Sequence, residues 1–394
     1  MKRIVIRSLP QAYEIIKEMN LSEEWSCDYR VAARESLTEI LECRMKDKIN
    51  RYMGELGSRD GEQRRNGYFS RHLLTELGDI ELHVPRTRKI SGVEVVTRYV
   101  RRASHVTRMI LACSVLGLST RKVSQALLPV SGEPVSASTV SRVARALDSA
   151  VQSFHRRPLK GRYRFLIFDG VVLKRTSGAG SVKRVVLVAL GITHDMKKEV
   201  IDFYIAQGES EGAWEAFLTD LYRRGLNEEG VELIVVDGGK GLLAALPMLY
   251  PGIDVQRCWA HKNRNVLNYV KKKDKEAVKA DLHKIQYASG IRKAQRAVGE
   301  FARKWKPIYP KAVACLLADE EQLLSFFNVK DPELWPQIRT TNVIERRFRE
   351  VRRRTRPMGV FSDPTSMERI LYAVFTYENL REKTFTPFLL TQNY

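Results

Sequence analysis

Apolar residues recur at helical spacing in the first part of the chain. Between Tyr29 and Met53 they return every three or four positions with charged residues between them, which predicts one amphipathic helix. A charged, Gly-rich stretch follows. A turn is predicted at Gly78-Asp79, and the apolar and polar residues that alternate after it are typical of a half-exposed strand. Residues 1–104 are therefore expected to form a helical region with a small β element.

Helical spacing returns in residues 105–157. Ser119 is placed to cap one helix and Ser136 to cap another, and the turn predicted between them, residues 129–134, is longer than the tightest helix-turn-helix allows. The second helix carries short polar and basic side chains that suit a DNA groove. These are Ser138, Thr139, Ser141, Arg142 and Arg145. We interpret this segment as a helix-turn-helix-like DNA-binding region; the alternative is a surface helix of an α-helical bundle.

After Pro158 the pattern changes to strands. Three apolar runs, separated by Gly and charged turns, predict three successive antiparallel strands at residues 164–168, 182–192 and 199–206. A helix with an apolar face, a continuous apolar run typical of a central strand, a second helix and a fifth strand are predicted next. Their ranges are 211–226, 231–236, 241–249 and 253–256. This order predicts the first part of an α/β core over residues 158–261.

Residues 262–337 are helical, basic and amphipathic, and prolines divide them into short pieces. Because no clear strand pattern occurs there, we treat this segment as an all-helical insertion. Residues 338–394 then complete the core with one more helix and a C-terminal tail. Trp305 has two interpretations: it belongs to the helical core, or it stacks on an unpaired base.

The net charge of the chain indicates the class of its binding partner. The chain has 67 Lys plus Arg against 46 Asp plus Glu, and its formal net charge of +21 favours a polyanion such as nucleic acid. Five scattered cysteines argue for a reducing compartment rather than a disulfide framework. No apolar run reaches membrane-spanning length, and Arg7 and Pro10 interrupt any signal-peptide stretch. We expect a soluble cytoplasmic protein, associated with the nucleoid and not with a membrane.

Three acidic residues are the candidates for chemistry. Asp169 and Asp237 each follow an apolar strand-like run, and Glu345 falls in the first turns of a helix that Thr341 or Asn342 can cap. A single Asp-Gly is usually only a turn. However, adjacent strands of a sheet present their carboxyl ends as neighbours, so Asp169 and Asp237 are expected to lie close together. A helix packed across those ends can add Glu345.

Crowded carboxylates repel one another unless cations are present. Mg²⁺ prefers oxygen ligands, and Mn²⁺ can substitute for it. Two such ions, about 3.5 to 4 Å apart, activate an attacking oxygen and stabilise a leaving oxygen in phosphoryl transfer. Attack by water cleaves a DNA strand and attack by a 3′-hydroxyl joins strands. We therefore predict that Asp169, Asp237 and Glu345 are catalytic and bind two metal ions.

Arginines crowd around Glu345, and their guanidinium groups suit phosphate contacts. Arg352, seven residues after Glu345, lies on nearly the same helical face. Arg346, Arg349 and Arg352 are therefore predicted to contact DNA.

Taken together, six motifs resemble those of a Mutator-type insertion-sequence transposase. They are Arg65-Asn-Gly-Tyr68, Gly78-Asp-Ile-Glu-Leu-His-Val-Pro-Arg86, Phe168-Asp-Gly170, Val236-Asp-Gly-Gly239, Cys258-Trp-Ala-His261 and Thr340-Thr-Asn-Val-Ile-Glu345. Each is weak alone, but their order and spacing are specific. This family belongs to the DDE class, whose catalytic core is ribonuclease H-like.

The resemblance implies an α/β fold, a ribonuclease H-like mixed sheet with an all-helical insertion, preceded by a mainly helical DNA-binding region. It implies that Asp169, Asp237 and Glu345 are the catalytic triad and bind divalent metal. It also implies binding of double-stranded DNA, both terminal inverted repeats and target DNA, with strand cleavage and transfer that can pass through an excised circle. A homodimer on DNA is expected by the same resemblance.

Cys258 and His261 form the Cys-x-x-His element that the family carries after its second Asp. A zinc site would need further ligands, and His283 and Cys315 lie at unpersuasive spacings. Support of the active site by packing, or a contact with DNA, is expected instead.

Two rival functions use parts of the same sequence. A catalytically inactive DNA-binding regulator would need no carboxylate, and the intact triad argues against it. A ribonuclease H-like nuclease acting in repair or on RNA would share the chemistry, and the DNA-binding-like region argues against that function.

Overall fold

The computed structural model describes residues 24–56, 65–87, 103–116, 118–131, 135–159, 163–177, 180–356, 361 and 364–383. The chain divides into two compact units, Met1–Ala146 and Leu147–Tyr394, and each is described by itself. The predicted C-terminal tail from residue 384 onward lies outside the described residues.

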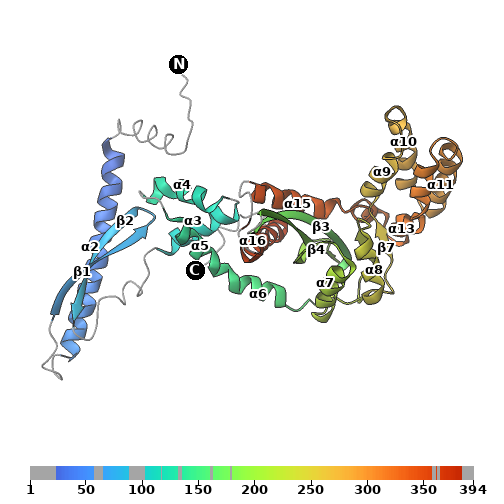
Figure 1. Cartoon of the computed structure of the whole chain (residues 1–394). Coiled ribbons are helices and arrows are strands. Elements are labelled where there is room, and N and C mark those ends of the chain that lie inside the picture. Colours follow the sequence, from blue (N-terminus) through green and yellow to red (C-terminus); the bar gives the residue numbers. More distant parts are fainter. Residues whose placement is uncertain are drawn as a thin grey trace, which may run out of the picture. The chain divides into compact units, whose positions relative to one another are not determined.

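The first unit begins with a long helix on a β-hairpin (Figure 1). Helix α2 (Glu24–Leu56) packs against antiparallel strands β1 (Arg65–Thr75) and β2 (Gly78–Thr87), with Met45 and Leu82 fully buried between them. The predicted amphipathic helix and small β element are confirmed. The predicted turn position is wrong: the chain turns at residues 76–77, where the Thr75 hydroxyl donates to the Gly78 carbonyl, and Gly78 already belongs to β2.

Three short helices complete the first unit. They are α3 (Ser104–Val115), α4 (Thr120–Ser131) and α5 (Ala137–Ala144), and buried valines, leucines and isoleucines join them in one core. The Ser136 hydroxyl accepts a hydrogen bond from the Thr139 N–H at 3.2 Å and caps α5, as predicted. Helix α4 runs to Ser131, so the predicted turn is wrong for residues 129–131 and lies outside the described residues at 132–134.

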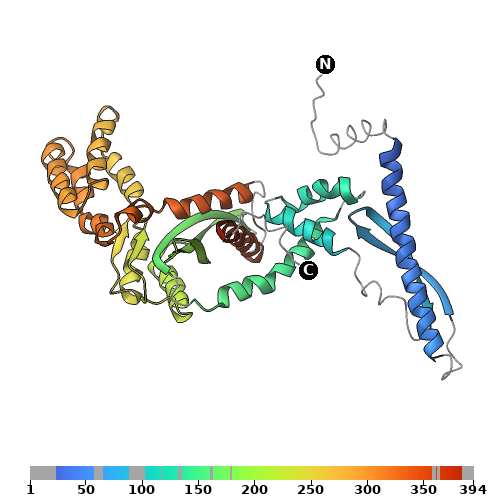
Figure 2. The ribbon, with the colours of Figure 1, turned by 180° about the vertical axis from the view of Figure 1, so that it is seen from behind.

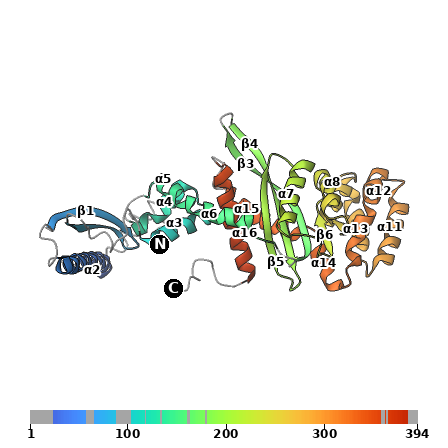
Figure 3. The ribbon, with the colours of Figure 1, turned by 90° about the horizontal axis from the view of Figure 1, so that it is seen from below.

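The second unit contains a five-stranded mixed sheet in the order β5-β4-β3-β6-β7. Strands β3, β4, β5 and β6 of this sheet are labelled in Figure 3. The strands are β3 (Tyr163–Ser177), β4 (Gly180–Thr193), β5 (Lys198–Ala206), β6 (Leu233–Val236) and β7 (Val255–Arg257). Strands β3, β4 and β5 are antiparallel neighbours, while β6 pairs parallel with β3 and β7 parallel with β6. The predicted order of strands is confirmed, and the fold is mixed α/β.

Helices cover both faces of this sheet (Figures 1 and 2). Leu166 and Phe168 of β3 pack with α7 (Glu211–Arg223) and α8 (Lys240–Leu249) on one face. Phe165 and Ile167 pack on the other face with α15 (Asn342–Thr355) and α16 (Pro364–Lys383). Because both faces are buried, the strands are continuous apolar runs rather than alternating ones.

The chain between β7 and α15 is helical. Its α-helices are α9 (Trp259–Leu267), α10 (Lys275–Gln286), α11 (Ile291–Trp305), α12 (Pro310–Leu317), α13 (Glu320–Leu324) and α14 (Trp335–Ile338). Residues 258–341, all of them described, contain no strand. Trp305 is only 5% exposed, and its indole N–H donates to Asp281 at 3.0 Å. Trp305 is therefore helical core, and the base-stacking interpretation is wrong.

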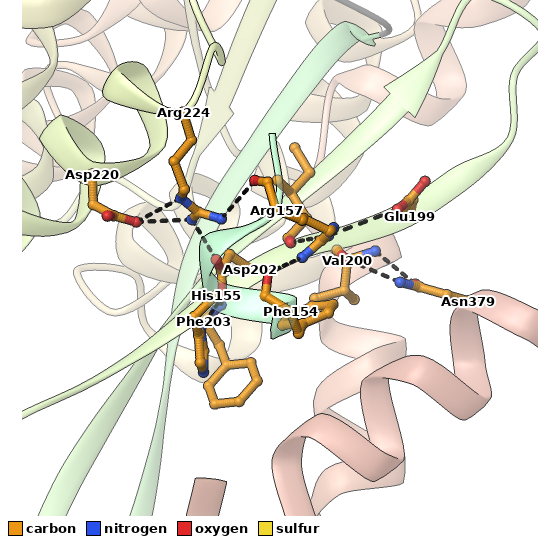
Figure 4. Close-up of polar contacts among 11 residues, drawn as sticks. Phe154, His155, Arg157, Glu199, Val200, Asp202, Phe203, Asp220, Arg224 and Asn379 are labelled. Atoms are coloured by element: carbon orange, nitrogen blue, oxygen red, sulfur yellow. Dashed lines mark hydrogen bonds and ion pairs between the residues drawn. The ribbon is translucent and has the colours of Figure 1, made fainter. Parts of the chain in front are cut away.

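The free edge of the sheet, strand β5, is covered by side chains (Figure 4). The Asn379 amide of α16 accepts from the Val200 N–H at 2.7 Å and donates to the Val200 carbonyl at 3.0 Å, as a neighbouring strand would. Arg157, which follows α6 (Asp148–Arg156), donates to the Ile201 carbonyl, and buried Asp202 accepts from His155. These contacts protect the edge from pairing with another chain.

Candidate active site

Asp169 lies within a strand rather than at its end. Strand β3 continues to Ser177, and Asp169 pairs with Val188 of β4, so the predicted position just after the strand is wrong. The reason is that β4 continues to pair with β3 beyond the parallel part of the sheet. That parallel part ends where Phe168 pairs with Val236, so Asp169 and Asp237 both follow the last pair of the β3–β6 ladder.

A tight glycine turn holds Asp237 at the end of β6. The Asp237 Oδ1 atom accepts from the Gly239 N–H at 2.9 Å, and Gly238 has a φ of +97°. That backbone conformation favours glycine, and a Cβ at Gly238 would also overlap the Arg257 guanidinium. The turn therefore fixes the backbone that carries Asp237.

The acidic side chains influence one another electrostatically. Asp169 is 6% exposed, and its Oδ1 accepts from the Gly170 N–H at 2.7 Å. Burial, and then the negative charge of Asp237 with a smaller contribution from Glu345, raise the pKa of Asp169 to about 7. The sheet and helix α15 thus bring the three predicted carboxylates together.

Glu345 lies in the first turn of α15 and is half-buried. Its Oε1 atom is 3.5 Å from the His261 Nε2 atom. Thr341 occupies the N-cap position of α15, but its side chain does not cap the helix, contrary to prediction. Its hydroxyl instead donates to the Cys258 Sγ atom at 3.3 Å, and its N–H donates to the same sulfur at 3.2 Å.

Cys258 and His261 link the end of β7 to this helix. The nearby Cys258 side chain is the main cause that raises the pKa of His261 to about 9. Burial raises the pKa of Cys258, but its hydrogen bonds with His261 and Thr341 outweigh that effect and lower it below the ordinary value. The raised pKa favours the protonated form of His261, whose Nε2 atom faces the Glu345 carboxylate. Both predicted support residues are at the site.

The arginines of α15 divide into two groups. Arg346, Arg349 and Arg352, the three predicted to contact DNA, are exposed. Arg347 and Arg354 are buried instead, in ion pairs with Glu378 and Glu350 respectively. The exposed group faces solvent. Arg353 is exposed as well but pairs with Glu350 at 3.0 Å, and the buried ion pairs hold the helix in place.

Helix α5 presents the predicted DNA-contacting side chains. Val140 and Val143 are buried, while Ser138 and Arg142 are exposed and Thr139 is half-buried. Arg145 is exposed but occupies the C-cap, beyond the body of α5 in which it was predicted.

One acidic residue at the site was missed from the sequence. Glu209 follows β5, and burial together with the charge of Asp237 raises its pKa. Nothing in its local sequence distinguishes it from an ordinary acidic residue before a helix. Its proximity to Asp237 is a tertiary contact.

The donor set suits a hard divalent cation. Carboxylate oxygens are the ligands that Mg²⁺ prefers, and a bound cation would relieve the repulsion that raises the Asp169 pKa. As the side chains stand, no three of the described His, Cys, Asp and Glu residues converge on one metal position. The residue types fit a metal, and the carboxylates would have to approach one another to bind it.

None of the helices in the described parts of the chain could span a membrane.

Comparison with known proteins identifies the family. Residues 14–383 match the model of the family described as "Transposase, Mutator family". The transposase for insertion sequence element IS905 of Lactococcus lactis is 30% identical over 89% of this chain and 89% of its own length. The transposase for ISRM5 of Rhizobium meliloti is 31% identical over 90% and 91%, and that for IS256 in transposon Tn4001 of Staphylococcus aureus is 33% identical over 79% and 80%. The chain therefore belongs to the Mutator family of transposases.

Proposed function

We propose that this protein is a DDE transposase. It binds the terminal inverted repeats of its insertion sequence and catalyses metal-dependent DNA strand cleavage and strand transfer. The observation that carries this proposal is that Asp169 and Asp237 both follow the last pair of the β3–β6 ladder, with Glu345 near enough to contribute to the raised pKa of Asp169. The strand order, with three antiparallel strands followed by two parallel ones on the far side of β3, supports a ribonuclease H-like core.

The three carboxylates would hold two Mg²⁺ ions, for which Mn²⁺ can substitute. When bound, the metal supplies activation of the attacking oxygen and stabilisation of the leaving oxygen. The β3–β6 ladder fixes the backbones of Asp169 and Asp237, while α15 supplies Glu345. His261 adds a positive charge beside Glu345 and restrains that carboxylate before any substrate arrives.

DNA binding would use two basic surfaces, one on each unit. The exposed face of α5, with Ser138 and Arg142, suits the groove of a terminal repeat. The exposed arginines of α15 lie on the helix that carries Glu345, where they can hold the phosphates beside the scissile bond. The net charge of +21 supports association with DNA in the nucleoid, and joining two ends supports a homodimer on DNA.

The test is cleavage of DNA that carries the inverted repeats flanking the gene. Purified wild type, Asp169→Asn, Asp237→Asn and Glu345→Gln are incubated with this DNA, with and without Mg²⁺, and nicks are mapped on a sequencing gel. Glu215→Gln, an exposed carboxylate on α7, is the matched control. We expect a metal-dependent nick at the repeat boundary in wild type and the control only. Binding by wild type without any nick would instead indicate an inactive DNA-binding regulator.

A further inference from the structure

Glu209 places a fourth carboxylate near Asp237 and against the residue that follows Asp169. A Cβ atom added at Gly170 would overlap the Glu209 Oε1 atom and lie 3.1 Å from its Cδ. A Cβ at Gly239 would lie 3.5 Å from the Asp237 Oδ1 and 3.8 Å from the Glu209 Oε2. The Glu209 carboxylate therefore lies against the residue that follows Asp169 and near the turn that follows Asp237.

The backbone does not explain the glycine at position 170. Gly170 is inside strand β3, and its φ is outside the left-handed region that favours glycine. Glycine within a strand weakens it and often marks a position where another group approaches closely. Here a Cβ atom at position 170 would meet the Glu209 carboxylate and, 3.3 Å away, the Val185 Cγ1 methyl group. The missing side chain at position 170 thus makes room for the Glu209 carboxylate against β3, one residue after Asp169.

Two helices hold Glu209 at this place. A Cβ at Gly241, in the first turn of α8, would overlap the Glu209 carbonyl oxygen, so the two backbones are in close contact. The next residue, Ser210, caps α7 by accepting a hydrogen bond from the Ala213 N–H at 3.3 Å. The Glu209 backbone is thus fixed by the starts of α7 and α8, and only its side chain can adjust.

No described side chain neutralises Glu209. Within the described part of the chain, its carboxylate has neither an ion pair nor a hydrogen-bond donor, whereas buried Asp202 and Asp281 each have a cationic partner. Glu209 is itself exposed, and an exposed glutamate can lack a partner, but an ordinary one would not need a glycine opposite it in a strand. Like charges that are held together favour a bound cation.

We propose that Glu209 is a fourth metal-binding carboxylate of this site and binds the divalent cation together with Asp169 and Asp237. This inference rests on the proposed function, because it concerns the same cation. The site then has two carboxylates from the neighbouring strands β3 and β6, one from the loop before α7 and one from α15. Glu209 and Glu345 reach the aspartates from separate elements, so Glu209 can bind the cation independently of the contacts that position α15.

The test measures Mn²⁺ binding to the full-length, DNA-free protein by electron paramagnetic resonance of the free ion. Glu209→Gln keeps the shape of the side chain and removes its charge, and Glu211→Gln, exposed two residues later, is the matched control. We expect Glu209→Gln to weaken Mn²⁺ binding roughly tenfold or more, the effect typical of losing a group that tunes a metal site. The control should bind as wild type does, and thermal melting should show both variants folded.

Gly170→Ala tests the same contact from the other side. We expect it to weaken Mn²⁺ binding in the wild-type background and to have little further effect in the Glu209→Gln background, because its methyl group acts by displacing that carboxylate. If Glu209→Gln binds Mn²⁺ as tightly as wild type while Asp237→Asn does not, the role of Glu209 is refuted and the proposed function stands. If Asp237→Asn also binds normally, the metal site of the proposed function fails.

Discussion

Replacement of Asp281 by asparagine should destabilise the helical segment in a pH-dependent manner. The Asp281 side chain on α10 is 11% exposed and accepts from the Trp305 indole at 3.0 Å, from Lys304 at 2.6 Å and from Lys284 at 2.7 Å. Burial alone would raise the pKa of Asp281, but these three donors outweigh it and lower the pKa to about 2. The ionised form is therefore the one that the fold stabilises.

The size of the effect follows from the pKa. A decrease from the ordinary value of 3.8 to about 2 corresponds to about 2 kcal/mol of differential stabilisation. Because the folded-state pKa is the lower one, this contribution is complete above about pH 4 and is lost as the pH falls towards 2. Both lysines are largely exposed, so solvent screening reduces their share of this stabilisation.

The measurement is urea unfolding of the full-length protein, followed by circular dichroism at pH 7 and pH 3. We expect Asp281→Asn to lower the unfolding free energy by about 1 to 2 kcal/mol at pH 7 and by less at pH 3. Glu276→Gln, an exposed acidic residue of the same helix, should change it by no more than about 0.5 kcal/mol at either pH. Equal stability of Asp281→Asn and wild type at pH 7, or a loss that does not depend on pH, would refute this reasoning.

Three further predictions concern the catalytic helix and DNA binding. Cys258→Ala should slow single-turnover cleavage roughly tenfold with little change in DNA affinity. Cys258→Ser should restore part of the rate, because its hydroxyl can still accept hydrogen bonds from Thr341 at the N-cap of α15. Equal cleavage rates for the two variants would exclude this positioning role. Glu378→Gln leaves the Arg347 guanidinium buried without its counter-charge and should lower the unfolding free energy by about 3 kcal/mol or more in urea, whereas a loss under 1 kcal/mol would contradict that role. Arg142→Ala should weaken binding to end-sequence DNA in a gel-shift titration and leave Mn²⁺ binding unchanged; unchanged DNA affinity would make α5 structural.

The sheet could be predicted from the sequence because its strands are buried on both faces. A short, continuous apolar run such as Leu233–Val236 is typical of a strand at the centre of a sheet. The end of β3 was mispredicted because beyond Asp169 the strand is partly exposed and polar, with Val172 and Lys174 both exposed. Only its pairing with β4 extends it to Ser177. Local pattern therefore identified the buried half of the hairpin and not the exposed half.

The finer features of the site depend on contacts between distant parts of the chain. The sequence indicates that Thr341 can cap a helix, and does not indicate that its hydroxyl donates to Cys258 instead. The sequence also does not indicate the role of Glu209, which depends on the space left at Gly170 in strand β3. Neither contact leaves a periodic pattern. Residue types at a site can be predicted from one sequence, but the choice between partners cannot.

The long separation between Asp237 and Glu345 is bridged by contacts between the end of β7 and the start of α15. The Trp259 N–H donates to the Arg339 carbonyl at 3.0 Å, and Thr341 contacts the Cys258 sulfur, so the chain leaves β7 and returns to α15 at adjacent positions. The helices between share one hydrophobic core with Ile344 and Phe348 of α15. Because closing a longer loop adds little entropic cost, the length of that segment is weakly constrained. A spacing rule therefore cannot locate the third carboxylate, whereas the two short motifs that meet at the base of the segment, Cys258 to His261 and Thr340 to Glu345, can.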